Sequence, residues 1–139
     1  MLLYTQRLGN LYTADTPGTA TLIAKSGYSG NGPGLNNPDM QCQEDVGPIP
    51  QGLWKIVGVF NKIPDHAPTD FALKLSPDPT TDVCGRTNFW IHGDRREDLA
   101  FDPHSASEGC MIFPLNVRQQ LWDIGNNYGT DLRVVADEP

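Results

Sequence analysis

The sequence predicts a mainly β, β-rich α+β domain with one late α-helix, and three observations support this class. Gly (14) and Pro (12) together make up 26 of the 139 residues, and both residue types interrupt helices. Short apolar runs with β-branched residues, bounded by turn residues, recur along most of the chain. Apolar residues at helical spacing form one convincing stretch, which follows Pro114.

The expected strands follow one another along the chain and are separated by turns. Residues 2–7 and 11–14 flank Gly9 and Asn10, a pair typical of a tight turn. The strongest strand pattern covers residues 53–60, directly after the rigid Gly-Pro-Ile-Pro turn of residues 47–52. These elements indicate a mainly antiparallel β domain. The other expected strands are 19–25, 71–75, 88–92 and 132–136, and the expected loops are 26–38, 77–85 and 93–107.

A helix is predicted over residues 114–127. Pro114 suits the first helical turn, where a backbone N–H has no partner within the helix. Gly125 or Gly129 lies where the helix is expected to end. The apolar side chains that define its buried face are Leu115, Val117, Leu121, Trp122 and Ile124.

Charge and hydropathy exclude several classes of partner. A net charge of -7 without a Lys/Arg cluster argues against nucleic acid, because phosphate binding needs basic patches. No stretch approaches the roughly 20 apolar residues of a membrane span, so no membrane insertion is expected. No signal peptide is visible in residues 1–7. The length fits one domain over residues 1–139.

Three cysteines cannot all pair within one chain, so the odd count predicts a free thiol. Cys42 and Cys84 can form a disulfide after export to an oxidising compartment or can stay reduced, and the sequence leaves both states open.

Two local patterns have residue types that can carry chemistry. In residues 90–94 an expected strand delivers His92 to a turn at Gly93, and in residues 107–113 Gly109 directly precedes Cys110. A nucleophilic cysteine needs a base and donors for an oxyanion. His92 can be the base, and Gly109 lets the backbone N–H groups of Cys110 and its neighbours face a developing oxyanion. A helix that opens near Pro114 would favour the thiolate if it lay close by.

These patterns resemble the L,D-transpeptidase (YkuD-like) catalytic motif, in which a His-Gly pair precedes a Ser-x-Gly-Cys element. The upstream stretch strengthens the match: Gly-Tyr-Ser-Gly at 27–30, Asn-Asn-Pro at 36–38 and Gly-Pro-Ile-Pro-Gln-Gly at 47–52 resemble a short bacterial branch of this fold. That branch includes antibacterial effectors, delivered by type VI secretion, that attack peptidoglycan. The resemblance covers roughly residues 7–113 and implies an L,D-transpeptidase-like β-sandwich or barrel.

The resemblance also implies roles for particular residues. Cys110 would attack an L,D bond of the peptidoglycan tetrapeptide stem, with His92 as base, Gly109 at the oxyanion and Ser107 orienting the histidine or contacting substrate. Cys110 would then be the free, reactive cysteine. The outcome would be carboxypeptidase, transpeptidase or D-amino-acid exchange activity, with no metal and no organic cofactor. The expected substrate-binding residues are Tyr28, Ser29, Gly93 and Glu108.

The expected partners and location follow from the same resemblance. The partners would be the peptidoglycan stem peptide and, for an effector, an immunity protein, and we expect a monomer. The protein would be made in the bacterial cytoplasm and act in the periplasm of a target cell after dedicated secretion. The chain departs from the family pattern at Glu108, where many members have His, and at residues 111–113, where an Arg is expected.

Two other functions fit parts of the sequence. A zinc hydrolase could use His92, His104 and Cys110, although the usual zinc-ligand spacings are absent. A non-catalytic cell-wall-binding or phage structural domain could keep the fold without the reaction. His66 is expected on a loop surface, Asp94 as a solvated charge, and Trp54 and Trp90 in the core.

Overall fold

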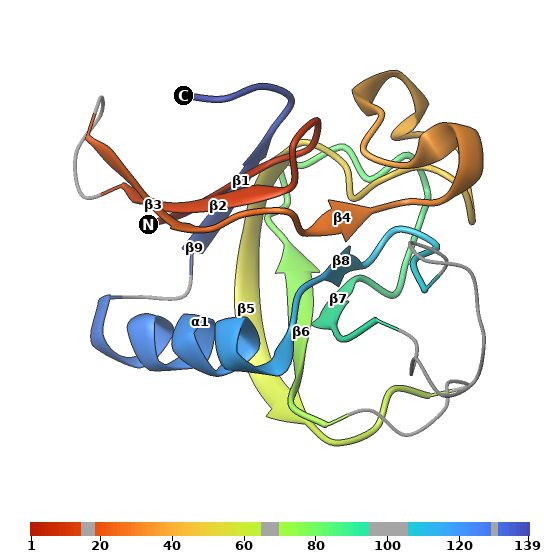
Figure 1. The fold of residues 1–139 in the computed structure, drawn as a ribbon. Coiled ribbons are helices and arrows are strands. Elements are labelled where there is room, and N and C mark those ends of the chain that lie inside the picture. The colour runs from red at the N-terminus through yellow and green to blue at the C-terminus, as the bar shows by residue number, and fades with distance from the viewer. Residues whose placement is uncertain (15–18, 65–69, 95–105, 129–130) are drawn as a thin grey trace.

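The computed structural model describes residues 1–14, 19–64, 70–94, 106–128 and 131–139. In this part of the chain, nine strands form a single mixed sheet, accompanied by one α-helix (Figure 1). Two short 3-10 helices, η1 (Gly32–Gly34) and η2 (Pro38–Met40), follow the fourth strand. The strands and the helix are β1 (Leu2–Thr5), β2 (Asn10–Ala14), β3 (Ala20–Ala24), β4 (Tyr28–Ser29), β5 (Gly52–Phe60), β6 (Ala72–Pro77), β7 (Trp90–His92), β8 (Met111–Ile112), α1 (Leu115–Tyr128) and β9 (Asp131–Val135).

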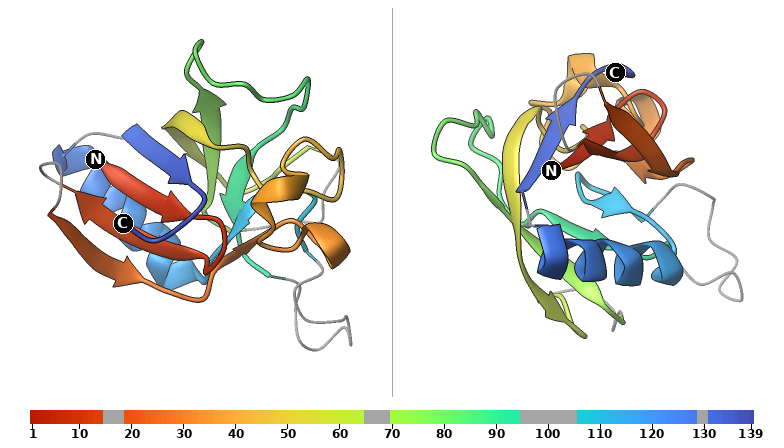
Figure 2. Two further views of the ribbon diagram at one scale, coloured as in Figure 1. Left: turned by 90° about the horizontal axis from the view of Figure 1, so that it is seen from above. Right: turned by 90° about the vertical axis from the view of Figure 1, so that its left-hand side faces the viewer.

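The strand order β3-β2-β1-β9-β5-β6-β7-β8-β4 makes the sheet curve back on itself (Figures 1 and 2). Its two outermost strands, β3 and β4, are joined by residues 25–27 alone, and the Gly27 N–H donates to the Gly9 carbonyl at 2.9 Å. The β1–β9 and β7–β8 pairs are parallel, and the other pairs are antiparallel. The predicted mainly β class with one late helix is confirmed, as a single curved sheet.

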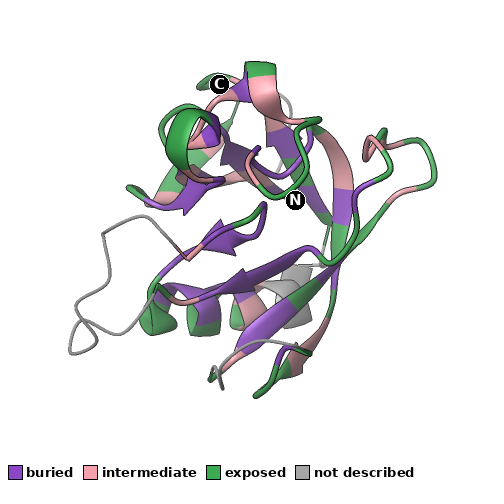
Figure 3. Cartoon of the chain, turned by 90° about the vertical axis from the view of Figure 1, so that its right-hand side faces the viewer, coloured by how far each residue is buried: buried purple, intermediate pink, exposed green. Residues whose placement is uncertain are grey.

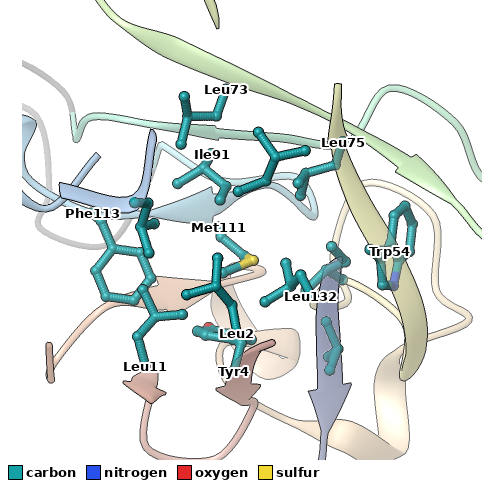
Figure 4. Packing of buried hydrophobic residues seen from close by; sticks show 14 of the residues in the cluster. Leu2, Tyr4, Leu11, Trp54, Leu73, Leu75, Ile91, Met111, Phe113 and Leu132 are labelled. Carbon is teal, nitrogen blue, oxygen red and sulfur yellow. The ribbon is translucent and has the colours of Figure 1, made fainter. Parts of the chain in front are cut away.

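Alternation of side chains along β7 and β8 divides the buried hydrophobic residues into two clusters. The larger cluster lies inside the curved sheet, where side chains from β1, β2 and β9 meet those from β6, β7 and β8 (Figure 4). Val117 and Leu121 of α1 also belong to it. Ile91 and Met111 point into it, and Trp54 lies there as predicted, 2% exposed. The smaller cluster contains Trp90, also buried as predicted, together with Tyr28, Ile63, Ala72, Cys110 and Ile112.

Helix α1 begins one residue later than predicted and packs against β6 and β7. The Pro114 carbonyl accepts hydrogen bonds from the N–H groups of Val117 and Arg118, so Pro114 precedes the first turn. Val117 and Leu121 are buried as predicted, but Leu115 is 43% exposed. The prediction was wrong for Leu115 because Arg118, rather than Leu115, turns inward.

The structure also resolves the pairing of the cysteines. Cys42 and Cys84 form a disulfide with 5.2 Å between their Cα atoms, and Cys110 is a free, buried cysteine. The bridge joins the loop after η2 to the turn before β7.

Burial is greatest at the centre of the sheet and least on the outer loops (Figure 3). None of the helices described is long and apolar enough to cross a membrane.

Candidate active site

The parallel pairing of β7 with β8 places His92 and Cys110 on the same face of the sheet. Ile91 pairs with Met111 and His92 with Ile112, so Cys110 lies beside Trp90. Side chains alternate along a strand, and therefore Cys110 shares its face with Trp90, His92 and Ile112. Ideal strand spacings put the Cα atoms of His92 and Cys110 roughly 8 Å apart on the diagonal.

The His92 imidazole is held in one tautomer by the backbone that follows it. Its Nδ1 lies 2.8 Å from the Gly93 carbonyl oxygen. A carbonyl oxygen can only accept, so Nδ1 carries the hydrogen and Nε2 is the unprotonated nitrogen of the neutral ring. The ring is 5% exposed. This arrangement suits a general base that acts through Nε2, oriented by a carbonyl.

The Cys110 thiol is buried within the smaller hydrophobic cluster. Its Sγ donates to the Asn88 carbonyl at 3.6 Å. Burial raises the pKa of the thiol to about 11, while a hydrogen bond with the Trp90 backbone lowers it. The charge of Glu108 also raises this pKa, and that of Arg86 lowers it. The resting nucleophile candidate is therefore a neutral thiol.

The Ser107 hydroxyl builds the turn that presents Cys110. Its Oγ accepts from the N–H groups of Gly109 (3.1 Å) and Gly30 (2.9 Å) and donates to the Cys110 carbonyl (2.6 Å). These three bonds use all the hydrogen-bonding capacity of the hydroxyl. The structure thus brings Ser107 to Cys110, and none of the hydrogen bonds of Ser107 to the described residues goes to His92.

These hydrogen bonds determine which backbone N–H group is left to donate to an oxyanion. The Gly109 N–H is committed to Ser107 Oγ, and the Gly109 carbonyl accepts from Ser29 Oγ at 2.9 Å. Within the part of the chain that the structure describes, the Cys110 N–H has no hydrogen-bond partner. The Cys110 N–H is therefore the donor at this turn that an oxyanion can use.

Position 109 requires glycine for two reasons, its backbone conformation and the lack of space for a side chain. Its φ of +138° is unfavourable for residues with a Cβ. A Cβ at this position would lie 2.5 Å from Arg86 Nη2 and 3.0 Å from the Phe89 ring. The turn before the nucleophile candidate therefore depends on glycine.

Tyr28 and Ser29 of β4 lie behind the turn and are buried. Ser29 Oγ accepts from the Ile49 N–H at 2.8 Å in addition to its bond to Gly109. The Tyr28 hydroxyl donates to Asp94 Oδ1 at 2.7 Å and accepts from the Ala106 N–H at 3.1 Å. Both side chains support the site from inside the fold.

Two acidic side chains next to the motif face solvent. Glu108 and Asp94 are exposed, although Asp94 accepts the Tyr28 hydrogen bond. Gly93 is half-buried, and a Cβ there would lie 3.0 Å from Arg118 Nη1. His66 and His104 lie outside the described residues.

The sequence did not point to two buried arginines beside the motif. Arg86 and Arg118 are each 5% exposed and donate to backbone carbonyls. Arg118 lies within the predicted helix, whose apolar pattern does not distinguish it, and Arg86 follows the expected loop 77–85, at a position for which no prediction was made. No local sequence pattern indicates that Arg86 is buried, because the carbonyls that it binds belong to residues 41–48 and 108.

Other features of the structure lie apart from this site. A surface hollow of about 370 Å³ lies over β5, β6 and β9 and includes no residue of the His92–Cys110 constellation. Four residues, 111–114, separate Cys110 from the start of α1, so the thiol is not part of the first turn of the helix. Among the described residues, no three His, Cys, Asp or Glu side chains form a group that could hold a metal.

Comparisons with known proteins place the chain in a family. The solved structure of Bdellovibrio bacteriovorus Bd1075 is similar, with a TM-score of 0.57 and 14% identity, and the likeness covers 97% of this chain and 47% of that one. The chain thus spans about half the length of that structure, and the likeness concerns the fold. A search of curated proteins finds no match. The model of the Tlde1 domain matches residues 24–134, and the chain therefore belongs to the Tlde1 domain family, a family of type VI secretion L,D-transpeptidase effectors.

Proposed function

We propose that this protein is a cysteine-dependent enzyme that acts on L,D bonds of the peptidoglycan tetrapeptide stem. The observation that carries the proposal is the β7–β8 pairing, which puts His92 and Cys110 on one face with glycine before the cysteine. Membership of the Tlde1 domain family supports peptidoglycan as the substrate. The proposal includes L,D-carboxypeptidase, L,D-transpeptidase and D-amino-acid exchange outcomes.

The first chemical step forms a thioester. His92 Nε2 takes the thiol proton of Cys110 as the sulfur attacks the carbonyl between the L-centre of the diamino acid and the terminal D-residue. The thiol must turn from the Asn88 carbonyl toward His92 for this transfer. The Cys110 N–H donates to the oxyanion, and one such donor is typically worth about 3–4 kcal/mol of barrier. The C–N bond then breaks, and the imidazolium returns its proton to the leaving amine.

The second step decides the product. Water attacks the thioester to give a free carboxylate and regenerate the thiol, which is the carboxypeptidase outcome. A D-amino acid or another stem can attack through its amine instead, which gives exchange or a cross-link. The exposed carboxylates of Glu108 and Asp94 can attract the ammonium groups of the stem.

The same proposal includes a place of action. We expect secretion as an effector, action in the periplasm of a target cell, and an immunity protein that protects the producer. The Cys42–Cys84 disulfide suits an oxidising compartment such as the periplasm. We expect the protein to work as a monomer.

One observation favours a second candidate function. A buried cysteine whose pKa is raised to about 11 is also typical of an inert structural thiol. A non-catalytic cell-wall-binding or phage structural domain would keep such a residue without using it.

Digestion of purified muropeptides distinguishes the two functions. Wild-type protein and Cys110→Ala are incubated with tetrapeptides and their cross-linked dimers, and the products are identified by mass spectrometry. We expect the wild type alone to release terminal D-alanine or to form new cross-links. Binding to sacculi by both proteins, with every stem left intact, would support the non-catalytic domain.

A further inference from the structure

Arg86 places a positive charge inside the protein next to the catalytic turn. Its side chain is 5% exposed, and none of its hydrogen bonds to the described residues goes to a carboxylate. Burial lowers the pKa of Arg86, and the nearby charges of Asp45 and Glu44 partly offset this effect. Burying a charge costs several kcal/mol unless hydrogen bonds replace its water. A buried cation of this kind needs a structural or chemical reason.

The four Nη hydrogens of Arg86 join residues 41–48 to residue 108, which is far away in sequence. Nη1 donates to the carbonyls of Gln41 (2.5 Å) and Pro48 (2.8 Å). Nη2 donates to the carbonyls of Gly47 and Glu108, both at 2.9 Å. The guanidinium therefore ties the loop after η2 and the Gly-Pro turn to the residue two positions before the nucleophile candidate.

The bond to Glu108 fixes the peptide unit that leads into Cys110. The carbonyl of the Glu108–Gly109 peptide is bound by Arg86, and its N–H is bound by Ser107 Oγ. With both polar groups held, this peptide cannot rotate without losing two hydrogen bonds. The next peptide, which carries the Cys110 N–H, is in turn held at its carbonyl by Ser29.

Phe89 and Gly109 pack closely against the Arg86 guanidinium. The Arg86 Cζ lies 5.2 Å from the centroid of the Phe89 ring. On the side of the turn, the missing Cβ of Gly109 leaves room for Nη2. Gly109 and Arg86 thus form one arrangement in which neither can change alone.

The Cys42–Cys84 disulfide holds the two ends of this arrangement. Cys84 is two residues before Arg86, and Cys42 directly follows Gln41, whose carbonyl Arg86 binds. The charge of Arg86 also favours the thiolate of Cys110 and opposes the effect of burial. The position after the cysteine, where the resemblance leads one to expect an arginine, holds Met111 and Ile112.

We propose that Arg86 is a positioning residue for the reaction, held by the Cys42–Cys84 disulfide, whose guanidinium fixes the Glu108–Gly109 peptide and with it the Cys110 N–H and thiol. It does not bind substrate, because it is buried and its four Nη hydrogens are already donated. The effect on turnover rests on the proposed function, whereas the effect on the thiol does not.

The test compares Arg86→Lys and Arg86→Met with two control arginines. Arg118→Lys is the control for a buried arginine. Arg118 also donates to backbone carbonyls, but none of these carbonyls belongs to residues 107–110. Arg133→Met removes an exposed charge from β9. Each protein is assayed for the rate of iodoacetamide alkylation against pH, for kcat and KM on a tetrapeptide muropeptide, and for thermal unfolding. With the disulfide intact, Cys110 is the one thiol that can react.

Distinct outcomes are expected for charge and for geometry. Arg86→Met should move the midpoint of the alkylation curve to higher pH, whereas Arg86→Lys, which keeps the charge, should stay near the wild-type midpoint. Both should lower kcat by roughly tenfold or more with a smaller change in KM, because lysine cannot bridge four carbonyls. Arg118→Lys should lower the melting temperature without moving the alkylation midpoint, and Arg133→Met should resemble the wild type in every assay.

Two results would overturn the proposal. The first is a wild-type kcat in Arg86→Lys, which also decides the question if Arg86→Met does not fold. The second is a fall in kcat that only follows the loss of thermal stability, as in Arg118→Lys, with an unchanged alkylation curve for Arg86→Met. If the wild type itself does not turn over muropeptides, the proposed function fails, and the alkylation curves still decide whether Arg86 acts on the thiol.

Discussion

At the scale of single residues, the proposed reaction needs His92 as a base to activate Cys110, because the pKa of the thiol is raised rather than lowered. Many reactive cysteines lie at helix N-termini or beside cations that stabilise the thiolate at neutral pH. Here burial raises the pKa of Cys110 to about 11, and the hydrogen bond between Nδ1 and the Gly93 carbonyl fixes the tautomer in which Nε2 of the neutral His92 ring can accept a proton. Proton transfer to His92 during attack is the route that these groups allow.

The raised pKa predicts how the free thiol titrates. Alkylation of folded wild-type protein by iodoacetamide should have its midpoint near pH 11, against about 8.5 for an ordinary cysteine. Because the folded pKa lies above the unfolded one, the thiol contributes stability that is present below about pH 8.5 and is lost as pH rises through about 11. A midpoint below pH 8 would show that the resting thiol is not held as described.

A second prediction at this scale concerns the Ser107 hydroxyl. Ser107→Ala removes the acceptor of two buried N–H groups and the donor to the Cys110 carbonyl. Each unsatisfied buried group costs about 1–3 kcal/mol, so the free energy of unfolding should fall and kcat should drop by roughly tenfold or more. Denaturant unfolding and muropeptide turnover measure both, with the exposed Ser76→Ala as the control. Unchanged turnover in Ser107→Ala would contradict the turn geometry.

At the scale of elements, the site depends on two strands of two residues each. β4 and β8 are held in the sheet by pairing with each other and with β7, not by any pattern of their own. The Ser107 hydroxyl takes the hydrogen bonds of the Gly30 N–H and the Cys110 carbonyl just beyond the end of their pairing. The pairing of β4 with β8 thus ends just before Cys110, whose N–H has no hydrogen-bond partner among the residues that the structure describes.

Gly109→Ala tests the turn as an element. Alanine should be strained at φ +138° and should collide with Arg86 Nη2, so both folding stability and turnover should fall. Gly32→Ala is the matched control, because Gly32 also has a positive φ (+51°) but a Cβ there meets no atom within 4 Å. The control should lose about 1 kcal/mol from strain, and Gly109→Ala should lose more. Equal losses in calorimetry would contradict the close approach of Arg86.

The sequence predicted long elements well and short ones poorly, for physical reasons. Strand β5 and helix α1 have enough residues for a periodic pattern to emerge. A strand of two residues is too short to show a periodic pattern. For this reason β4 was assigned to the expected loop 26–38, and β8 was not separated from the motif of residues 107–113. The roles of His92 and Cys110 were suggested by their neighbours in sequence, whereas that of Arg86 depends on carbonyls of residues 41–48 and 108, which no local pattern reveals.

At the scale of the whole molecule, the Cys42–Cys84 disulfide connects stability to the compartment. Closing a loop between residues 42 apart should stabilise the fold by roughly 4 kcal/mol in the chain-entropy account. Reduction, or the double variant Cys42→Ser/Cys84→Ser, should therefore lower the melting temperature by roughly 10 °C or more. Reductant should not affect the double variant further, which is the internal control. A melting temperature independent of reductant in the wild type would show that the bridge does not stabilise the fold.

At the scale of the whole reaction, the proposed enzyme forms a covalent bond between Cys110 and the peptide stem. Intact-protein mass spectrometry after rapid mixing with a tetrapeptide muropeptide, followed by acid quench, measures it directly. We expect a wild-type species heavier by the acyl group of the stem without its terminal D-residue, mapped to Cys110 by digestion and absent from Cys110→Ala. Turnover of the muropeptide by Cys110→Ala at the wild-type rate, with no adduct on the wild type, would contradict the central claim.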